Sequence, residues 1–155
     1  MLTTKQKLRN CARKNKWQNI VIFVLLLLFL GLIIYICVQQ VHESYAQSDP
    51  MLERLRNHLK PLHPVVDKIS LYMGNKSYTI NKKKVYLCLK DKNGRYYDFN
   101  MLVYVFIHEL AHVLCKEIGH TTKYYDIFRS LLRKAAQMKL YDPKKPIIQN
   151  YCGHK

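Results

Sequence analysis

Residues 98–120 read DFNMLVYVFIHELAHVLCKEIGH, and this stretch decides how the rest of the chain must fold. Asp98 is a residue type that begins helices, and Gly119 is a type that ends them. The residues between them are apolar on almost every side, and such a helix must be buried. We therefore predict that this segment is the core helix of a domain and that it runs until Gly119 stops it.

Three polar residues interrupt the apolar run from Met101 to Cys115: His108, Glu109 and His112. Histidines four residues apart lie on one face of a helix, one turn apart, so both imidazoles can bind one ion. In this pattern the carboxylate takes a proton from a water molecule that the ion activates. A catalytic zinc needs three protein ligands and an open position. We expect a Zn²⁺ site with ligands His108, His112 and His120, which follows the Gly119 turn, and with Glu109 as the catalytic general base.

Other interpretations of the pattern stay open. The HExxH pattern also arises by chance, and a structural zinc would be closed by a fourth ligand. The candidates for that ligand are Cys115, Glu117, Cys152 and His154. The sequence does not identify a residue that stabilises an oxyanion, although Tyr124, Tyr125 and Tyr151 are of a suitable type. With no pair at CxxC spacing among five cysteines, we expect no disulfide framework.

The segments around the core helix predict an α+β domain with about three helices and a short three-stranded sheet. Leucines at helical spacing predict a first helix from about Met51 that ends before Pro61 and Pro64. The predicted strands are 68–73, 78–80 and 85–89, with turns at 81–84 and 91–94. A last helix is predicted over 122–140, followed by an irregular tail. We expect the three lysines of the 81–84 turn to be exposed to solvent. The alternative is that they contact phosphate or anionic lipid.

Residues 108–128, HELAHVLCKEIGHTTKYYDIF, resemble the small gluzincin-like metallopeptidases of the SprT and WLM type. Segments between Ser77 and Tyr151, such as YTINKKKVYLCLKD and NYCG, look like the metallopeptidase-like proteins of large nucleocytoplasmic DNA viruses. The resemblance implies a zinc-dependent fold of a few strands and three helices. It assigns the ligands to His108, His112 and His120 and the base to Glu109. It also implies a viral, virion-associated setting.

A second feature, residues 20–38, reads IVIFVLLLLFLGLIIYICV, without a charge over 19 residues. At 1.5 Å per residue this run can cross a hydrocarbon core of about 30 Å. It is longer than the apolar part of a signal peptide, the alternative explanation, and no cleavage site of small residues follows it. We expect a single transmembrane helix at 20–38, after a basic segment at 1–19. A linker at 39–50 and the HExxH domain at 51–155 should follow.

Charge gives the expected orientation and the kind of partner. The chain carries 26 Lys and Arg against 10 Asp and Glu, which favours anionic partners. The six basic residues before the apolar run, without an acid among them, place the N-terminus on the cytosolic side. We recognise no nucleic-acid-binding motif and do not expect nucleic acid as a partner.

Two functions agree with these observations. The first is a membrane-anchored zinc metallopeptidase, a hydrolase that cleaves a nearby polypeptide substrate. The alternative is a structural, minor capsid protein of the virion with a retained, inactive peptidase fold. Such a protein would join an internal membrane of the virion to capsid proteins of the shell.

Overall fold

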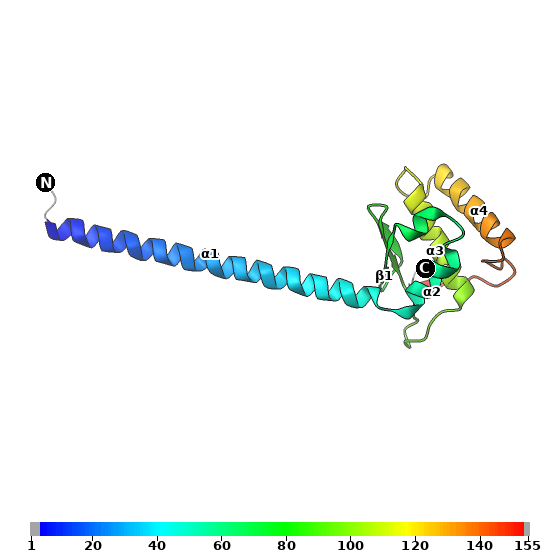
Figure 1. The fold of residues 1–155 in the computed structure, drawn as a ribbon, viewed down its shortest axis with the longest axis horizontal. Helices are drawn as coiled ribbons and strands as arrows, with labels where there is room; N and C mark the ends of the chain where they lie inside the picture. Colours follow the sequence, from blue (N-terminus) through cyan, green and yellow to red (C-terminus); the bar gives the residue numbers. More distant parts are fainter. Residues whose placement is uncertain (1–3, 154–155) are drawn as a thin grey trace. The chain divides into compact units, whose positions relative to one another are not determined.

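The structure is a computed structural model that describes residues 4–153. The chain divides into two units, Met1–His42 and Glu43–Lys155, and each is described by itself. Helix α1 (Thr4–Gln47) makes up the first unit and continues into the start of the second. Figure 1 shows the elements along the chain in sequence colours.

The first unit holds a single apolar span. Within α1 the segment Lys16–Val41 is long and apolar enough to cross a membrane, with a mean hydropathy of 3.3. None of its side chains is buried against the protein, unlike those of a core helix. A signal sequence has the same length and composition. The predicted apolar helix at 20–38 is thus present as one candidate membrane span.

The predicted linker at 39–50 differs from the structure. Helix α1 runs through Gln47, and only Ser48 and Asp49 separate it from helix α2 (Pro50–Leu59). Gln, Glu and Ala within this stretch are favourable helix formers, so a polar composition alone did not end the helix. The break comes where Asp49 caps α2, accepting a hydrogen bond from the Met51 backbone N–H at 2.9 Å, and Pro50 occupies the first turn.

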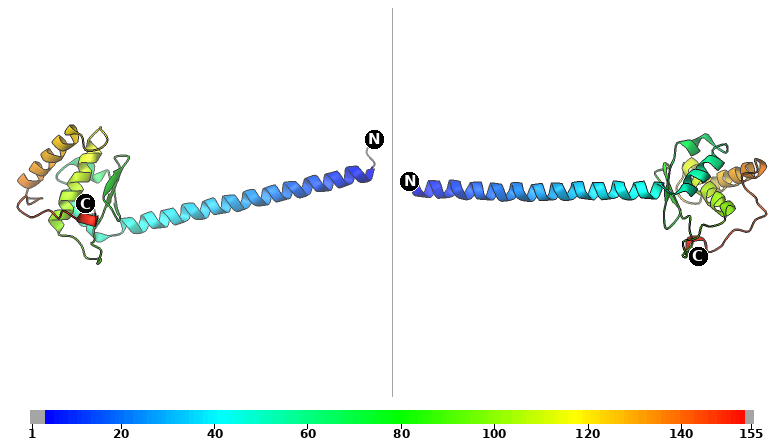
Figure 2. Two further views of the ribbon diagram at one scale, coloured as in Figure 1. Left: turned by 180° about the vertical axis from the view of Figure 1, so that it is seen from behind. Right: turned by 60° about the horizontal axis from the view of Figure 1, so that its bottom comes forward.

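The second unit is an α+β domain, as predicted. Besides α2, its elements are the 3₁₀ turn Pro64–Asp67, strands β1 (Ser70–Met73), β2 (Tyr78–Ile80) and β3 (Lys84–Leu87), and helices α3 (Phe99–Leu114) and α4 (Thr122–Gln137). A last 3₁₀ turn spans Tyr151–Gly153. Both views in Figure 2 and the view in Figure 1 place α3 between the sheet and α4, so the core helix is covered on two sides.

The sheet has strand order β1-β3-β2, so β2 is an edge strand. Strand β3 pairs with β1 in parallel and with β2 in antiparallel orientation. Leu71 and Val85 point to the core, and Thr79 in the same register points the same way. On the opposite face Tyr72, Tyr86 and Tyr78 stack across the three strands. The sheet therefore presents one polar side chain, Thr79, to the helix that carries the candidate site.

Two predicted helix ends are wrong. The core helix was expected to run to Gly119, but α3 ends at Leu114 and Cys115 has an extended backbone. The last helix was expected to reach 140 and ends at Gln137. Gly119 does have a positive φ of 84°, but it lies in the loop after the helix. Lys82 caps this end of α3, where its ammonium donates hydrogen bonds to the backbone carbonyls of His112 and Cys115.

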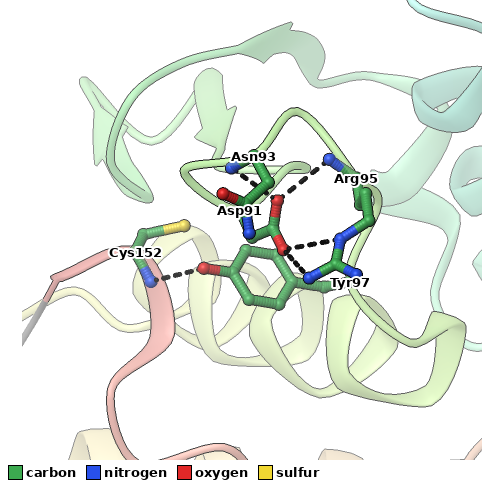
Figure 3. A network of polar contacts seen from close by, with 5 residues as sticks. All are labelled: Asp91, Asn93, Arg95, Tyr97 and Cys152. Carbon is green, nitrogen blue, oxygen red and sulfur yellow. Dashed lines mark hydrogen bonds and ion pairs between the residues drawn. The ribbon is translucent and has the colours of Figure 1, made fainter.

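A disulfide joins Cys88, just after β3, to Cys152 in the tail, a pairing that the sequence did not predict, since we expected no disulfide framework. The two cysteines are 64 residues apart, a separation that no spacing rule recognises. The buried Tyr151 holds the tail beside Cys88, because its hydroxyl donates a hydrogen bond to the Cys88 carbonyl. Figure 3 shows the next contact, in which the Cys152 N–H donates to the Tyr97 hydroxyl beside the turn that Asp91 organises.

Candidate metal centre

Helix α3 presents His108, Glu109 and His112 near its C-terminal end. The side chain of Asp98 caps the helix by accepting from the Asn100 N–H, and the apolar residues around it fix the helix in the core. With that orientation set, His108 and His112 lie on one face with their ring centroids 5.1 Å apart. This is the arrangement that the four-residue spacing predicts.

His120 returns to this face from the loop between α3 and α4. Its Nε2 lies 3.1 Å from Nε2 of His112 and 3.2 Å from Nε2 of His108. Among the described residues, these three histidines form the one group of metal-ligating side chains with ligand atoms within 4.8 Å of one another. The structure thus brings together the three residues that the sequence singled out.

The surroundings favour the neutral, ligating form of the imidazoles. Burial and the neighbouring His112 and His120 lower the pKa of His108 to about 4. Burial, His120 and the ammonium of Lys82 lower the pKa of His112 as well. Metal ligation requires an unprotonated nitrogen, and both side chains therefore offer one at neutral pH.

Tyr124 orients His108 from the first turn of α4. Its hydroxyl lies 2.7 Å from Nδ1 of His108 and donates to the His108 backbone carbonyl at 3.4 Å. A hydroxyl that donates to the carbonyl can accept a hydrogen bond from Nδ1–H. That tautomer leaves the lone pair of His108 on Nε2, which faces His120. Burial raises the pKa of the Tyr124 hydroxyl, which therefore keeps its proton.

Glu109 is a buried carboxyl, 3% exposed, that β2 contacts from the other side. The hydroxyl of Thr79 donates to Glu109 Oε2 at 2.8 Å. Burial raises the pKa of Glu109 to about 7 in the metal-free protein, and the hydrogen bond from Thr79 opposes that rise. A carboxyl that titrates near neutrality suits proton transfer in both directions.

An open pocket of about 580 Å³ lies over these residues. Its walls are the edge strand β2 with the turn that follows it, the histidine face of α3, and the loop residues Glu117 to His120. Because β2 is an edge strand, its outer backbone groups have no partner strand within the described sheet. The pocket therefore joins the three imidazoles to an edge that an extended peptide can pair with.

The structure also tests the fourth-ligand candidates. Cys152 is bonded to Cys88, Cys115 is buried, and neither it nor Glu117 joins the histidine group within residues 4–153. His154 lies outside the described residues. Within the described part of the chain, the site therefore offers three candidate ligands and an open side, the arrangement that a catalytic zinc needs.

Sequence reasoning missed the roles of three residues around the histidines. Tyr124 and Thr79 contact His108 and Glu109, and Lys82 holds the end of α3 and the loop after it. The sequence offered Tyr124 only as a residue type suited to stabilising an oxyanion, and the lysine run was expected to be a solvated turn. A signal for Thr79 was present, because a polar residue on the inner face of a predicted strand requires a partner.

Three relatives are proteins of large DNA viruses. The uncharacterized protein 136R of Invertebrate iridescent virus 6 is 50% identical over 91 residues, 57% of this chain and 51% of that protein. The uncharacterized protein 042R of Invertebrate iridescent virus 3 is 45% identical over 99 residues, 60% of this chain and 62% of that protein. The uncharacterized protein R325 of Acanthamoeba polyphaga mimivirus is 32% identical over 124 residues, 71% of this chain and 57% of that protein.

The chain therefore spans between about half and three fifths of the length of the relatives it matches. No family model matches the chain, and no solved structure matches it. The relatives agree with the viral setting that the sequence led us to expect. The metallopeptidase resemblance stays a prediction that rests on the site itself.

Proposed function

We propose that this chain is a membrane-anchored, zinc-dependent metallopeptidase. The observation that carries the proposal is the convergence of the three Nε2 atoms of His108, His112 and His120 beside a buried Glu109, at the wall of an open pocket. Each of these groups has a role in metal-assisted peptide hydrolysis, and their separation suits a single ion.

The donor set fits zinc. Ligand bonds of about 2.0–2.1 Å at tetrahedral angles place two imidazole nitrogens roughly 3.3–3.4 Å apart, close to the 3.1 and 3.2 Å between His120 and its two neighbours. Without an ion, Nε2 of His120 has at most one proton to donate to two facing nitrogens. A cation at the centre would satisfy all three lone pairs at once. When bound, zinc supplies Lewis-acid chemistry, polarising a carbonyl and making water easier to deprotonate.

Each residue around the site would then have its own role in hydrolysis. Glu109 would accept a proton from the attacking water and deliver it to the nitrogen that leaves the peptide bond. Thr79 donates a hydrogen bond to one oxygen of that carboxyl at 2.8 Å, and Glu109 lines the pocket. Tyr124 holds the ring and tautomer of His108. The edge of β2 would bind the substrate polypeptide in extended form, with backbone hydrogen bonds.

For the membrane, we propose that α1 is a single-pass anchor with its basic N-terminal flank on the cytosolic side, in an internal membrane of a virion. The domain would then lie across the membrane. The disulfide Cys88–Cys152 supports this placement, since such bonds persist in oxidising surroundings. Protease added outside sealed vesicles should cleave only one of the two parts, the N-terminal segment or the domain, until detergent opens the vesicles. Cleavage of both from one side would contradict the anchor.

The test uses the full chain in non-ionic detergent, compared with Glu109→Gln and with His120→Ala. We expect about one zinc per wild-type chain, the same content in Glu109→Gln, and a clear loss in His120→Ala. Hydrolysis of a mixed peptide library should occur with the wild type alone, and the loss in Glu109→Gln should be at least about a hundredfold.

Two outcomes would count against this proposal. A wild-type chain that binds no zinc would remove its basis. If the wild-type chain binds zinc but cleaves peptides no faster than Glu109→Gln, the domain has the zinc site but no peptidase activity. That result would favour the alternative, in which the domain joins the membrane to capsid proteins as a structural component.

A further inference from the structure

The third ligand stands on a loop with few contacts of its own. Within the described residues 4–153, no hydrogen bond joins the backbone of residues 116–120 to another backbone group. Ile118 is 92% exposed, so it contributes no apolar anchor. His120 is itself exposed, and its contacts are with the other site rings and with Tyr125. Something else must hold this loop if His120 is to stay within reach of His108 and His112.

The side chain of Lys82 makes the contacts that the loop lacks. Its ammonium donates to the backbone carbonyl of His112 at 3.1 Å, to that of Cys115, and to that of Glu117 at 3.4 Å. These carbonyls run from the last turn of α3 into the loop, so one cation bridges the helix end and the start of the loop. It also satisfies carbonyls that have no partner inside the helix.

The backbone of Lys82 points to the same role. Asn81 and Lys82 both have positive φ, 49° and 55°, and the Lys83 N–H donates to the Ile80 carbonyl to close the turn. Turns with two successive left-handed residues favour Asn followed by Gly. Lysine is a costly residue in the second position, because its Cβ disfavours that conformation. A strained backbone of this kind is typical of a functional position.

We propose that Lys82 is a positioning residue of the metal centre, whose ammonium clamps the loop after α3 and so keeps His120 within ligand distance of His108 and His112. The inference rests on the proposed zinc site and deepens it. Lys82 does not contact the ion; it acts through the loop that carries the third ligand.

The turn itself supplies the test variant. Lys82→Gly removes the ammonium and relieves the left-handed backbone, so the hairpin should keep or improve its stability. Lys83→Asn is the matched control, because Lys83 is the next residue of the turn and its side chain makes no hydrogen bond or ion pair within the described residues. Both variants are compared with wild type as full chains in non-ionic detergent.

With Zn²⁺ as the probe, we expect Lys82→Gly to bind about tenfold more weakly or worse in competition with a chromophoric chelator. With Co²⁺, its visible absorption should change as a tetrahedral site loses a ligand. The metal-free thermal midpoint should change little, because relief of the left-handed backbone offsets the lost hydrogen bonds. Lys83→Asn should bind both ions as wild type does. Trypsin should also cleave metal-free Lys82→Gly faster after Lys116, inside the loop.

The outcomes separate the two proposals. If the wild type binds no zinc, the metal centre is wrong, and faster cleavage after Lys116 still tests the clamp. If zinc binds equally well to wild type and Lys82→Gly, or cleavage after Lys116 is unchanged, the clamp is wrong and the metal centre stands. If Lys82→Gly does not fold, Lys82→Asn replaces it, because asparagine also tolerates the left-handed conformation.

Discussion

Removing a single hydroxyl, in Tyr124→Phe, tests whether the site is organised as a metal centre. Tyr124 is fully buried and contacts His108 in two ways: by its hydroxyl at 2.7 Å from Nδ1 and by its ring, 5.4 Å between centroids. Phenylalanine keeps the ring and its packing and removes only the hydrogen bond. His108 then loses the partner that fixes its tautomer and its orientation.

The magnitude follows from what that hydrogen bond does. Loss of a hydrogen-bond partner of a metal-binding histidine typically weakens metal affinity by about 10–100-fold. The metal-free fold should lose only about 1 kcal/mol, the net contribution of one hydrogen bond. The effect on zinc binding should therefore exceed what destabilisation alone explains. A change confined to stability would instead mark Tyr124 as an ordinary core residue.

The assay is zinc competition against a chromophoric chelator near pH 7, with thermal unfolding of the metal-free chain measured in parallel. Tyr104→Phe is the control, because Tyr104 also packs on Phe128 but its hydroxyl has no hydrogen bond within the described residues. Equal zinc affinity in wild type and Tyr124→Phe, within about twofold, would refute the reasoning, because a tautomer-fixing contact is worth more than that.

Two further predictions concern the stability of the domain. Burial raises the pKa of Asp49, but hydrogen bonds from the Met51 N–H, Lys90 and Tyr96 outweigh it and hold that pKa below its ordinary 3.8. The stability that Asp49 contributes is present above its unfolded pKa and lost as the pH falls through the lower folded value. The difference in thermal midpoint between wild type and Asp49→Asn should therefore shrink at acid pH, and a constant difference would contradict the assignment. Replacing Cys88 and Cys152 by serine should lower the unfolding free energy by about 4 kcal/mol on the chain-entropy estimate for a 64-residue separation, and reductant should have the same effect on wild type but none on the variant.

The sequence determined the features that depend on neighbours along the chain. Long runs of apolar residues located the candidate span in α1 and the buried helix α3. The four-residue spacing placed His108 and His112 on one face, and Asp98 and the 81–84 segment marked a cap and a turn as predicted. These signals are local, because helix faces and turns are set by residues within one or two turns of each other.

The tertiary structure decided the contacts between residues that lie far apart in the chain. Lys82 caps the end of α3 from 33 residues away, Thr79 reaches Glu109 across 30 residues, and the disulfide spans 64. No periodic pattern in the sequence signals these contacts, because they form only when segments that are far apart in the chain pack together. The sequence proposed His120 as a ligand, but its approach to the other imidazoles follows from that packing, which the spacing of the histidines alone does not specify.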